Sequence, residues 1–139
     1  MNLEIIQINE SNSNYLDCLD EDIFDQTIAP DLLAQYLKEA NHIMVVARSD
    51  ERVIGQVLGV IHRHPDKPTE LYIDDMAVSE PFQRKGIATK MLKKVFAVGA
   101  SIGCKEIWVA TEPDNEAAKA CYNSLNLSSR IALVFEGEL

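Results

Sequence analysis

Two adjacent carboxylates interrupt a strand-like run of the sequence. Asp74 and Asp75 lie in the middle of "LYIDDMAV", residues 71–78, although aspartate is depleted in strands because its short charged side chain fits a half-buried pleated surface poorly. Carboxylates at a site attract an ammonium group, and they can accept the proton that an amine must lose before it reacts as a nucleophile. Side chains alternate along a strand, so we expect only one of the two to point at such a site, unless a bulge intervenes. Two solvated charges on an edge strand are the alternative.

A basic turn follows this strand and opens a helix. Residues 83–86 read "QRKG". Free N–H groups and the positive end of a helix dipole at this point, with Gly86 allowing close backbone approach, make an anion site. The spacing matches neither the P-loop nor the dinucleotide-binding glycine pattern. A tight strand-to-helix turn with solvated basic residues explains the same residues equally well.

The composition is that of a globular protein with an acidic surface. The chain has 139 residues, of which 47% are hydrophobic and 25% charged, so we predict one domain over residues 1–139. A net charge of −9 disfavours nucleic acid as a partner and favours polyamines, aminoglycosides or basic peptides, although acidity that only maintains solubility is the simpler explanation. No apolar run is long enough to span a bilayer and no signal peptide is recognisable, which predicts a cytoplasmic protein without membrane partners.

The cysteines and histidines lack the spacing of a metal site. Cys18, Cys104 and Cys121 are widely scattered, which argues against disulfides and zinc and predicts buried thiols. His62 and His64 could share a strand face and bind a metal. No further ligand accompanies them at a suitable spacing, so we predict a solvated strand end and no metal.

Hydrophobic periodicity predicts the elements that must position these residues. We expect strands at 3–9, 43–48, 53–62, 69–78, 106–110 and 130–136, and helices after Ser13 and at 30–40, 86–102 and 115–125. This order predicts a mixed α/β sheet that is antiparallel early and parallel after the crossover helix. The last run, "RIALVFE", is an apolar strand without a following partner. We therefore predict a homodimer formed through it, unless a neighbouring strand covers this edge.

Two motifs resemble signatures of the GNAT superfamily of acyl-CoA-dependent N-acyltransferases. Residues 83–88, "QRKGIA", are similar to the Q/R-x-x-G-x-G/A signature and follow a strand, as that family requires. Asn115, Ala118 and Tyr122 stand at the family's N-x-x-A-x-x-x-Y spacing after the strand "EIWVA". The element order agrees across nearly the whole chain. The resemblance implies the GNAT fold, in which an antiparallel meander is followed by a parallel pair of strands splayed by a bulge.

A narrower resemblance, over about residues 69–92, is to the aminoglycoside 3-N-acetyltransferase branch. Its members have a similar "Y-I-x-D-x-A-V" strand and "R-x-G-I-A-T" helix start. Two departures stand elsewhere: residues 126–127 are Asn-Leu where the family usually has Gly-Phe, and residues 132–134 are apolar where the branch has polar residues. The second departure argues against an aminoglycoside substrate.

The resemblance implies direct transfer of acetyl from acetyl-CoA to an amine of a small cationic substrate. The backbone N–H of Val78 would polarise the thioester oxygen, Tyr122 would protonate the departing thiolate, and Asp75 would serve the acceptor amine. The residues implied in acetyl-CoA binding are Met76, Ala77, Val78, Gln83, Arg84, Lys85, Gly86, Ile87, Ala88, Thr89, Asn115 and Tyr122. Those implied in acceptor binding are Asp74, Asp75 and Glu112.

Simpler roles and other functions stand beside these assignments. Tyr122 could be an ordinary core tyrosine, and Asn115 could be a helix N-cap. Cys121 is interpreted as packing, because direct transfer needs no acyl-enzyme. The other functions considered are acetylation of a protein or peptide amine, which would need an open groove, and a non-catalytic acyl-CoA-binding sensor.

Overall fold

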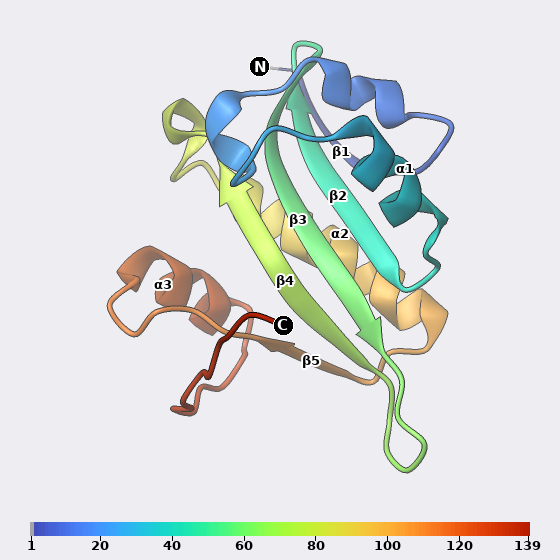
Figure 1. The fold of residues 1–139 in the computed structure, drawn as a ribbon. Coiled ribbons are helices and arrows are strands. Elements are labelled where there is room, and N and C mark those ends of the chain that lie inside the picture. Colours follow the sequence, from blue (N-terminus) through green and yellow to red (C-terminus); the bar gives the residue numbers. More distant parts are fainter. Residues whose placement is uncertain (1) are drawn as a thin grey trace.

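Over residues 2–139, which the computed structural model describes, five strands form one sheet (Figure 1). They are β1 (Leu3–Ile8), β2 (His42–Ser49), β3 (Arg52–His62), β4 (Glu70–Val78) and β5 (Glu106–Val109). Their order in the sheet is their order in the sequence. The first four pair antiparallel, and β5 pairs parallel to β4. The predicted mixed sheet is confirmed.

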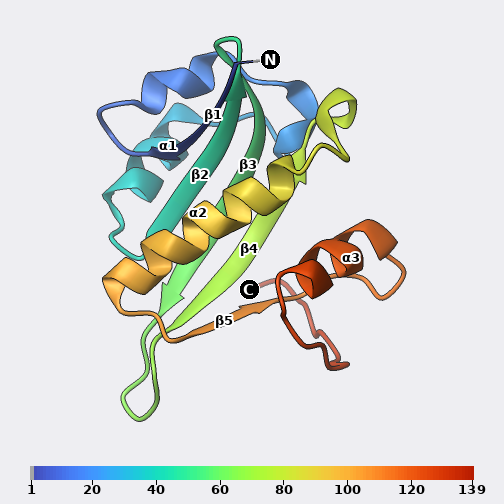
Figure 2. The same ribbon diagram turned by 180° about the vertical axis from the view of Figure 1, so that it is seen from behind.

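The helices cover both faces of this sheet (Figures 1 and 2). Helix α2 (Ile87–Ile102) crosses one face, while α1 (Pro30–Lys38) and the short 3-10 turns η1 (Ser13–Asp17) and η2 (Glu21–Ile23) lie on the other. A third 3-10 turn, η3 (Glu80–Phe82), follows β4, and α3 (Glu116–Ser124) follows β5. Within the described residues, none of these helices has the length and apolar character needed to cross a membrane.

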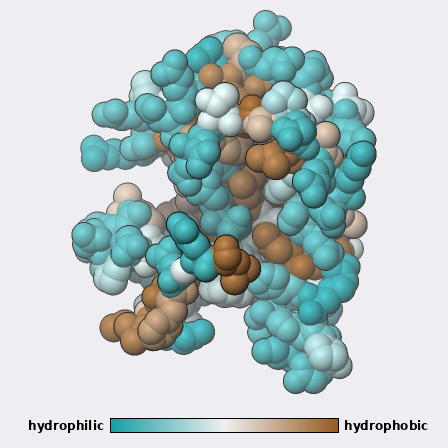
Figure 3. All heavy atoms as spheres, viewed as in Figure 1, coloured by the Kyte–Doolittle hydropathy of each residue, from teal (hydrophilic) through white to brown (hydrophobic). Residues whose placement is uncertain are grey.

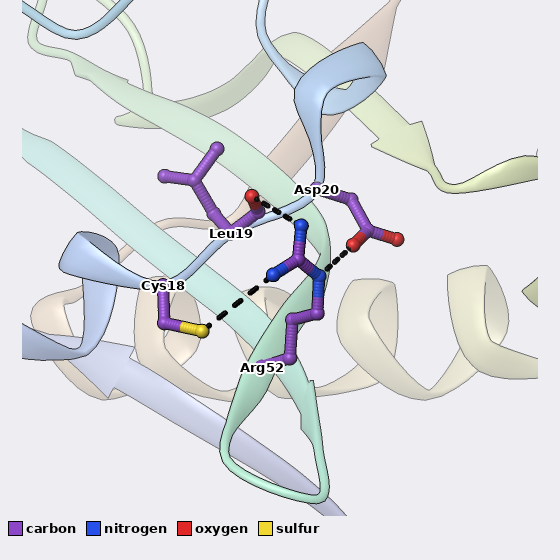
Figure 4. Close-up of polar contacts among 4 residues, drawn as sticks. All are labelled: Cys18, Leu19, Asp20 and Arg52. Atoms are coloured by element: carbon purple, nitrogen blue, oxygen red, sulfur yellow. Dashed lines mark hydrogen bonds and ion pairs between the residues drawn. The ribbon is translucent and has the colours of Figure 1, made fainter.

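The segment after Ser13 forms the two short 3-10 turns η1 and η2 instead of the single helix predicted there, because the backbone between them pairs with β3. Val53 donates its N–H to the Cys18 carbonyl at 2.9 Å, and Asp20 donates to the Val53 carbonyl at 3.0 Å. Arg52 adds an ion pair with Asp20 and hydrogen bonds to the Leu19 carbonyl at 3.1 Å and the Cys18 sulfur at 3.7 Å (Figure 4). A helix would need these backbone groups for itself. Cys18 is thereby exposed rather than a buried thiol, and Cys104 and Cys121 are half-buried.

Each face of the sheet has its own buried cluster, and neighbouring residues of one strand divide between them. Val45 belongs to the cluster under α2, whereas Val46 belongs to the cluster under η1, η2 and α1, as the two-residue period of a strand requires. Helix α2 packs closely on the sheet, since a Cβ placed at Gly99 would lie 3.0 Å from the Leu71 side chain. Strands β2, β3 and β4 are therefore packed on both faces.

The strand predicted at 130–136 is also wrong for this chain. Residues 127–139 have no regular secondary structure, and Ile131 and Phe135 are 96% and 90% exposed. A strand forms only when its backbone groups find a partner, and the sheet order within residues 2–139 ends at β5. Figure 3 shows brown, apolar side chains on the surface of the lower-left lobe, where α3 and the segment after it lie in the same view as Figure 1.

The parallel pair separates after a short ladder. Pairing of β4 with β5 runs from Glu70 opposite Glu106 to Ile73 opposite Val109, whereas β4 continues to Val78. On the other edge of β4 the register shifts, because Leu58 pairs with Asp75 but the next residue of β3 pairs with Ile73. This bulge leaves Asp74 as the extra residue. The splayed pair that the family resemblance implied is therefore present.

Candidate active site

A cleft of about 850 Å³ occupies the space between the diverging strands. Its walls come from β4, the turn before α2, the end of β5 and the inner side of α3. In Figure 3 the surface is notched at the left, between the lobe that carries α3 and the upper part of the sheet. The predicted donor-site residues that line the cleft are Met76, Ala77, Val78, Gln83, Arg84, Gly86, Ile87, Ala88, Thr89, Asn115 and Tyr122.

The turn before α2 brings backbone amides to one end of this cleft. Arg84 and Gly86 both have left-handed backbones, with φ of 63° and 78°, and glycine adopts this conformation without the steric cost of a Cβ. The first helical residues, 87–89, line the cleft. The N-terminus of α2, where unpaired N–H groups and the helix dipole favour an anion, therefore lies at the cleft.

Lys85 is the one predicted donor-site residue of this turn that does not line the cleft. Its ammonium lies 5.8 Å from the centre of the Phe82 ring, within the range of a cation–π contact. Lys85 can therefore add positive potential near the turn without lining the cleft.

The backbone of Val78 faces the cleft. Ser79 donates its N–H to the Ile54 carbonyl at 2.8 Å, which directs Ser79 toward β3. Successive strand residues present their backbone groups to opposite sides, so the N–H and C=O of Val78 are directed toward the side that β5 has left. The Val78 carbonyl accepts a hydrogen bond from Gln83 Nε2 at 2.9 Å.

Both adjacent aspartates line the cleft, so the alternation expected from a regular strand does not hold here. The bulge at Asp74 changes the register of β4, which lets neighbouring side chains share a face. Asp22, from the turn η2, lines the cleft as well, and nothing in the sequence around it indicated that position. Glu112 is exposed and lies outside the cleft lining.

Burial and contacts differ between the two adjacent aspartates. Asp74 is exposed, and its negative charge adds to burial in raising the pKa of Tyr36 and of Tyr72. Asp75 is half-buried and accepts a hydrogen bond from Gln56 Nε2 at 2.9 Å. The more enclosed carboxylate thus has a fixed protein donor.

Tyr122 lies on α3 and lines the opposite wall of the cleft. It is half-buried and packs against the cluster under α2. Burial raises the pKa of its phenol, and the negative potential of Cys121 and Asp75 raises it further. The phenol therefore keeps its proton at neutral pH. The neighbouring Cys121 sulfur lies 3.7 Å from the Thr89 hydroxyl.

The Asn115 side chain caps α3. Its Oδ1 accepts a hydrogen bond from the Ala118 N–H at 3.1 Å, so the N-cap explanation is confirmed. Asn115 also lines the cleft. Asn115 can therefore cap the helix and still contact a ligand in the cleft.

The two strand-end histidines are separated in their contacts. His64 Nε2 lies 2.9 Å from a carboxylate oxygen of Glu70, whereas the His62 ring stacks on Tyr72 with centroids 5.6 Å apart. The Tyr72 ring in turn lies against the Trp108 ring, with centroids 4.2 Å apart. Among residues 2–139 no three metal-binding side chains gather into one cluster.

Comparison with known proteins places this fold and cleft in a family. Residues 7–126 match the model of the acetyltransferase (GNAT) family. N-alpha-acetyltransferase 30 of Schizosaccharomyces pombe is 32% identical over 108 residues, covering 72% of each chain. L-2,4-diaminobutyric acid acetyltransferase of Methylotuvimicrobium alcaliphilum is 31% identical over 81 residues, which cover 58% of this chain and 46% of that enzyme.

Solved structures share the fold at lower identity. AAC(6')-Iy in complex with a CoA-containing bisubstrate analog superposes with a TM-score of 0.82 at 19% identity, covering 100% of this chain and 99% of the other. An aminoglycoside acetyltransferase from an uncultured soil metagenomic sample, in complex with sisomicin, gives 0.82 at 18% identity, covering 99% and 96%. The names that print a position are 6' rather than 3, so the 3-N branch stays a prediction.

The family match extends over most of the chain, and the yeast relative is similar across the same proportion of both proteins. The fold and the cleft between the splayed strands agree with it. The chain therefore belongs to the acetyltransferase (GNAT) family and is an acetyl-CoA-dependent N-acetyltransferase.

Proposed function

We propose that this enzyme transfers acetyl directly from acetyl-CoA to an amine of a small cationic substrate, in the cleft between β4 and β5. The observation that carries the proposal is the composition of that cleft. Asp22, Asp74 and Asp75 line it together with the protonated phenol of Tyr122. Carboxylates attract an ammonium group, and a protonated phenol opposite them can serve a leaving thiolate.

The donor half of the cleft suits acetyl-CoA. The pantetheine arm would lie along residues 76–78 of β4, where the Val78 N–H would donate to the thioester oxygen as charge develops on it. The amides of residues 84–89 would bind the pyrophosphate at the N-terminus of α2. Arg84 lines this end of the cleft, and Lys85 adds charge from beside it.

The reaction we propose has one bond formed and one broken at the acetyl carbon. The substrate amine, once neutral, attacks the thioester carbonyl, so that a C–N bond forms and the C–S bond breaks. Tyr122 gives its proton to the departing thiolate of CoA. The proton that the amine loses passes to Asp75, directly or through water, and the products are the acetylated amine and free CoA.

The names of similar proteins support a small amine with several charges. They include L-2,4-diaminobutyric acid acetyltransferase and aminoglycoside acetyltransferases, whose named substrates carry more than one amino group. The relative named N-alpha-acetyltransferase 30 supports a second candidate, an α-amine of a peptide or protein.

The experiment is a thiol-release assay on the purified protein with acetyl-CoA and separate amines. The panel contains L-2,4-diaminobutyrate, aminoglycosides, polyamines and peptides with a free α-amine, and mass spectrometry identifies each acetylated product. We expect turnover with at least one small cationic amine. Turnover with peptides alone would favour the second candidate. Binding of acetyl-CoA without any turnover would contradict the proposal and indicate a sensor.

Variants of the acidic residues separate a site role from general acidity. Asp75→Asn should raise the KM for the amine, because it removes the enclosed negative charge of the cleft. Glu112→Gln is the matched control, since Glu112 is exposed and outside the cleft lining. An equal effect of both substitutions on the amine KM would contradict the role of Asp75.

We also propose that the enzyme forms a homodimer through residues 130–136. Ile131, Leu133, Val134 and Phe135 are exposed large apolar side chains, and a contiguous apolar surface of this kind is typical of an interaction site. Pairing with a second copy would give this β-rich run the strand partner that residues 2–139 of its own chain do not provide. Val134→Lys should then dissociate the dimer in light scattering. An active wild-type monomer of 15.5 kDa at micromolar concentration would contradict it.

We expect the reaction to take place in the cytoplasm. The three cysteines are free, which suits a reducing compartment. Fractionation with an antibody to the native protein tests this expectation.

A further inference from the structure

A glutamine lies buried inside the sheet, beside the acceptor end of the cleft. Gln56 is 0% exposed and occupies the middle of β3, among buried apolar residues that include Val57 on the same strand. Burying an amide away from water costs free energy unless it is hydrogen-bonded. A polar side chain at this position therefore needs an explanation from its contacts.

The two N–H groups of this amide have two different partners. Gln56 Nε2 donates to the backbone carbonyl of Ile23 at 2.8 Å and to Asp75 Oδ2 at 2.9 Å. Both partners are acceptors, which fixes the orientation of the amide, because the reverse orientation would place its oxygen against two oxygens.

The oxygen of the amide does not add to stability. Gln56 Oε1 is buried and has no hydrogen-bond partner among residues 2–139, and an unsatisfied buried acceptor is destabilising. An apolar side chain of similar shape would avoid that cost. The favourable contacts of the amide are therefore those of its nitrogen, with the Ile23 carbonyl and the Asp75 carboxylate.

Those two groups connect Gln56 to two of the acidic residues that line the cleft. Asp75 lines the cleft, and Ile23 follows Asp22, which lines it as well. A neutral donor on Oδ2 fixes the Asp75 carboxylate without cancelling its charge, as an arginine or lysine partner would. The other carboxylate oxygen stays available to an ammonium group.

We propose that Gln56 is a positioning residue, which holds Asp75 and the η2 segment in the arrangement that binds the substrate ammonium. The inference rests on the proposed function and assigns the specificity for cationic amines to a buried contact. Gln56 itself touches neither substrate nor acetyl-CoA. It acts through the Asp75 carboxylate, and its loss should be felt by the amine and not by the acetyl donor.

The test is calorimetric binding of L-2,4-diaminobutyrate to the CoA complex of the wild type and of Gln56→Met, a variant of similar shape without the amide. We expect the dissociation constant for the diamine to rise about tenfold, the size typical of a lost hydrogen bond to a charged group. Affinity for acetyl-CoA should stay within about twofold. The matched control is Val57→Ala, which removes buried volume from the neighbouring residue and should lower the melting temperature without changing diamine affinity.

A double-variant cycle separates positioning from a merely structural role. In the Asp75→Asn background, Gln56→Met should have little further effect on diamine affinity, because the group that it positions is gone. Independent, multiplying effects of the two substitutions would overturn the inference. The inference would also be overturned if the wild type and Gln56→Met bound the diamine with equal affinity, or if neither bound it. Failure of the proposed function is seen separately, as absence of thiol release by the wild type with every amine.

Discussion

The body of the molecule and its C-terminal quarter, from β5 onward, differ in how they are held. All the buried residues of the described chain lie between Ile8 and Gly99, in β1–β4, α2 and the segments that cover them. Strand β5, helix α3 and the segment after it contribute side chains that are at most half-buried. The cleft lies between these two regions, so one wall is anchored in a core and the other is not. A ligand in the cleft would contact both.

The difference follows from how much apolar surface each region can bury. Strands β2 and β3 supply continuous apolar residues to two faces, and burial of apolar area is the dominant favourable term in folding. Helix α3 has the sequence EAAKACYNS, whose alanines and serine offer little such area. Its main attachments are the half-buried Cys121, Tyr122 and Leu125, which pack against the cluster under α2.

The largest expected effect is catalytic and lies in the loosely held wall. Tyr122→Phe should lower kcat by about 10²–10⁴-fold, as is typical of a lost general acid, with acetyl-CoA affinity almost unchanged. Steady-state kinetics with a fixed amine measures it. Tyr15→Phe is the control, since Tyr15 lies beneath the Arg48 guanidinium and outside the cleft lining. Full activity of Tyr122→Phe would contradict the role of Tyr122 as general acid.

The second effect measures the contrast in stability directly. Leu92→Ala should lower the free energy of unfolding by about 2–5 kcal/mol, because Leu92 is 0% exposed and leaves a cavity. Leu133→Ala should change it by no more than about 0.5 kcal/mol, because Leu133 is 82% exposed. Urea titrations at a concentration where the chain is monomeric give both values. Similar losses for the two leucines would contradict the contrast.

A smaller pair of effects distinguishes the turn before α2, where we propose that acetyl-CoA binds, from an ordinary helix end. Gly86 and Gly103 flank α2 with φ of 78° and 112°, and a Cβ at either meets no atom within 4 Å. Alanine at either position should cost about 1–2 kcal/mol of stability, for the left-handed backbone. Only Gly86→Ala should also weaken acetyl-CoA binding, because only Gly86 lines the cleft. Equal acetyl-CoA affinity of the two variants would contradict the anion site.

The smallest effect concerns alkaline pH. Burial, with a contribution from the charge of Asp74, raises the pKa of Tyr36 above its usual value, and its hydroxyl donates to the Ile43 carbonyl. The folded state then keeps a proton that the unfolded state loses, so this contribution is complete below about pH 10 and stability falls as pH rises above it. Tyr36→Phe should make that fall less steep. Equal slopes from denaturant titrations between pH 9 and 11 would contradict the assignment.

Much of the body, and of the residues that line the cleft at the turn before α2, could be predicted from the sequence, because their signals are local. The apolar runs of β2 and β3 and the helical spacing in 86–102 determine those elements, and the turn "QRKG" with Tyr122 at its motif spacing placed the cleft. The errors fall where pairing across the chain decides. The segment after Ser13 forms two 3-10 turns because the backbone between them pairs with β3, and residues 130–136 find no strand partner among residues 2–139.

The acceptor half needed the structure for a similar reason. A strand pattern alone gives opposite directions to Asp74 and Asp75, and only the register of β4 against β3 reveals the bulge. Asp22 enters the cleft from a distant turn without any motif. Gln56 stood out only as one polar residue in the run "VIGQVLGVI", and its partners lie 33 and 19 positions away.

Hydrogen exchange of the free enzyme and of the enzyme saturated with acetyl-CoA tests the account most directly. Without ligand, we expect amides of β5 and α3 to exchange faster than those of β2 and β3, because the core lies under the latter. With acetyl-CoA, protection should increase at residues 76–78, 84–89 and along α3, the two walls of the cleft, and hardly change in β1 and β2. Equal protection of both regions in the free enzyme, or no change at residues 84–89 on adding acetyl-CoA, would contradict the account.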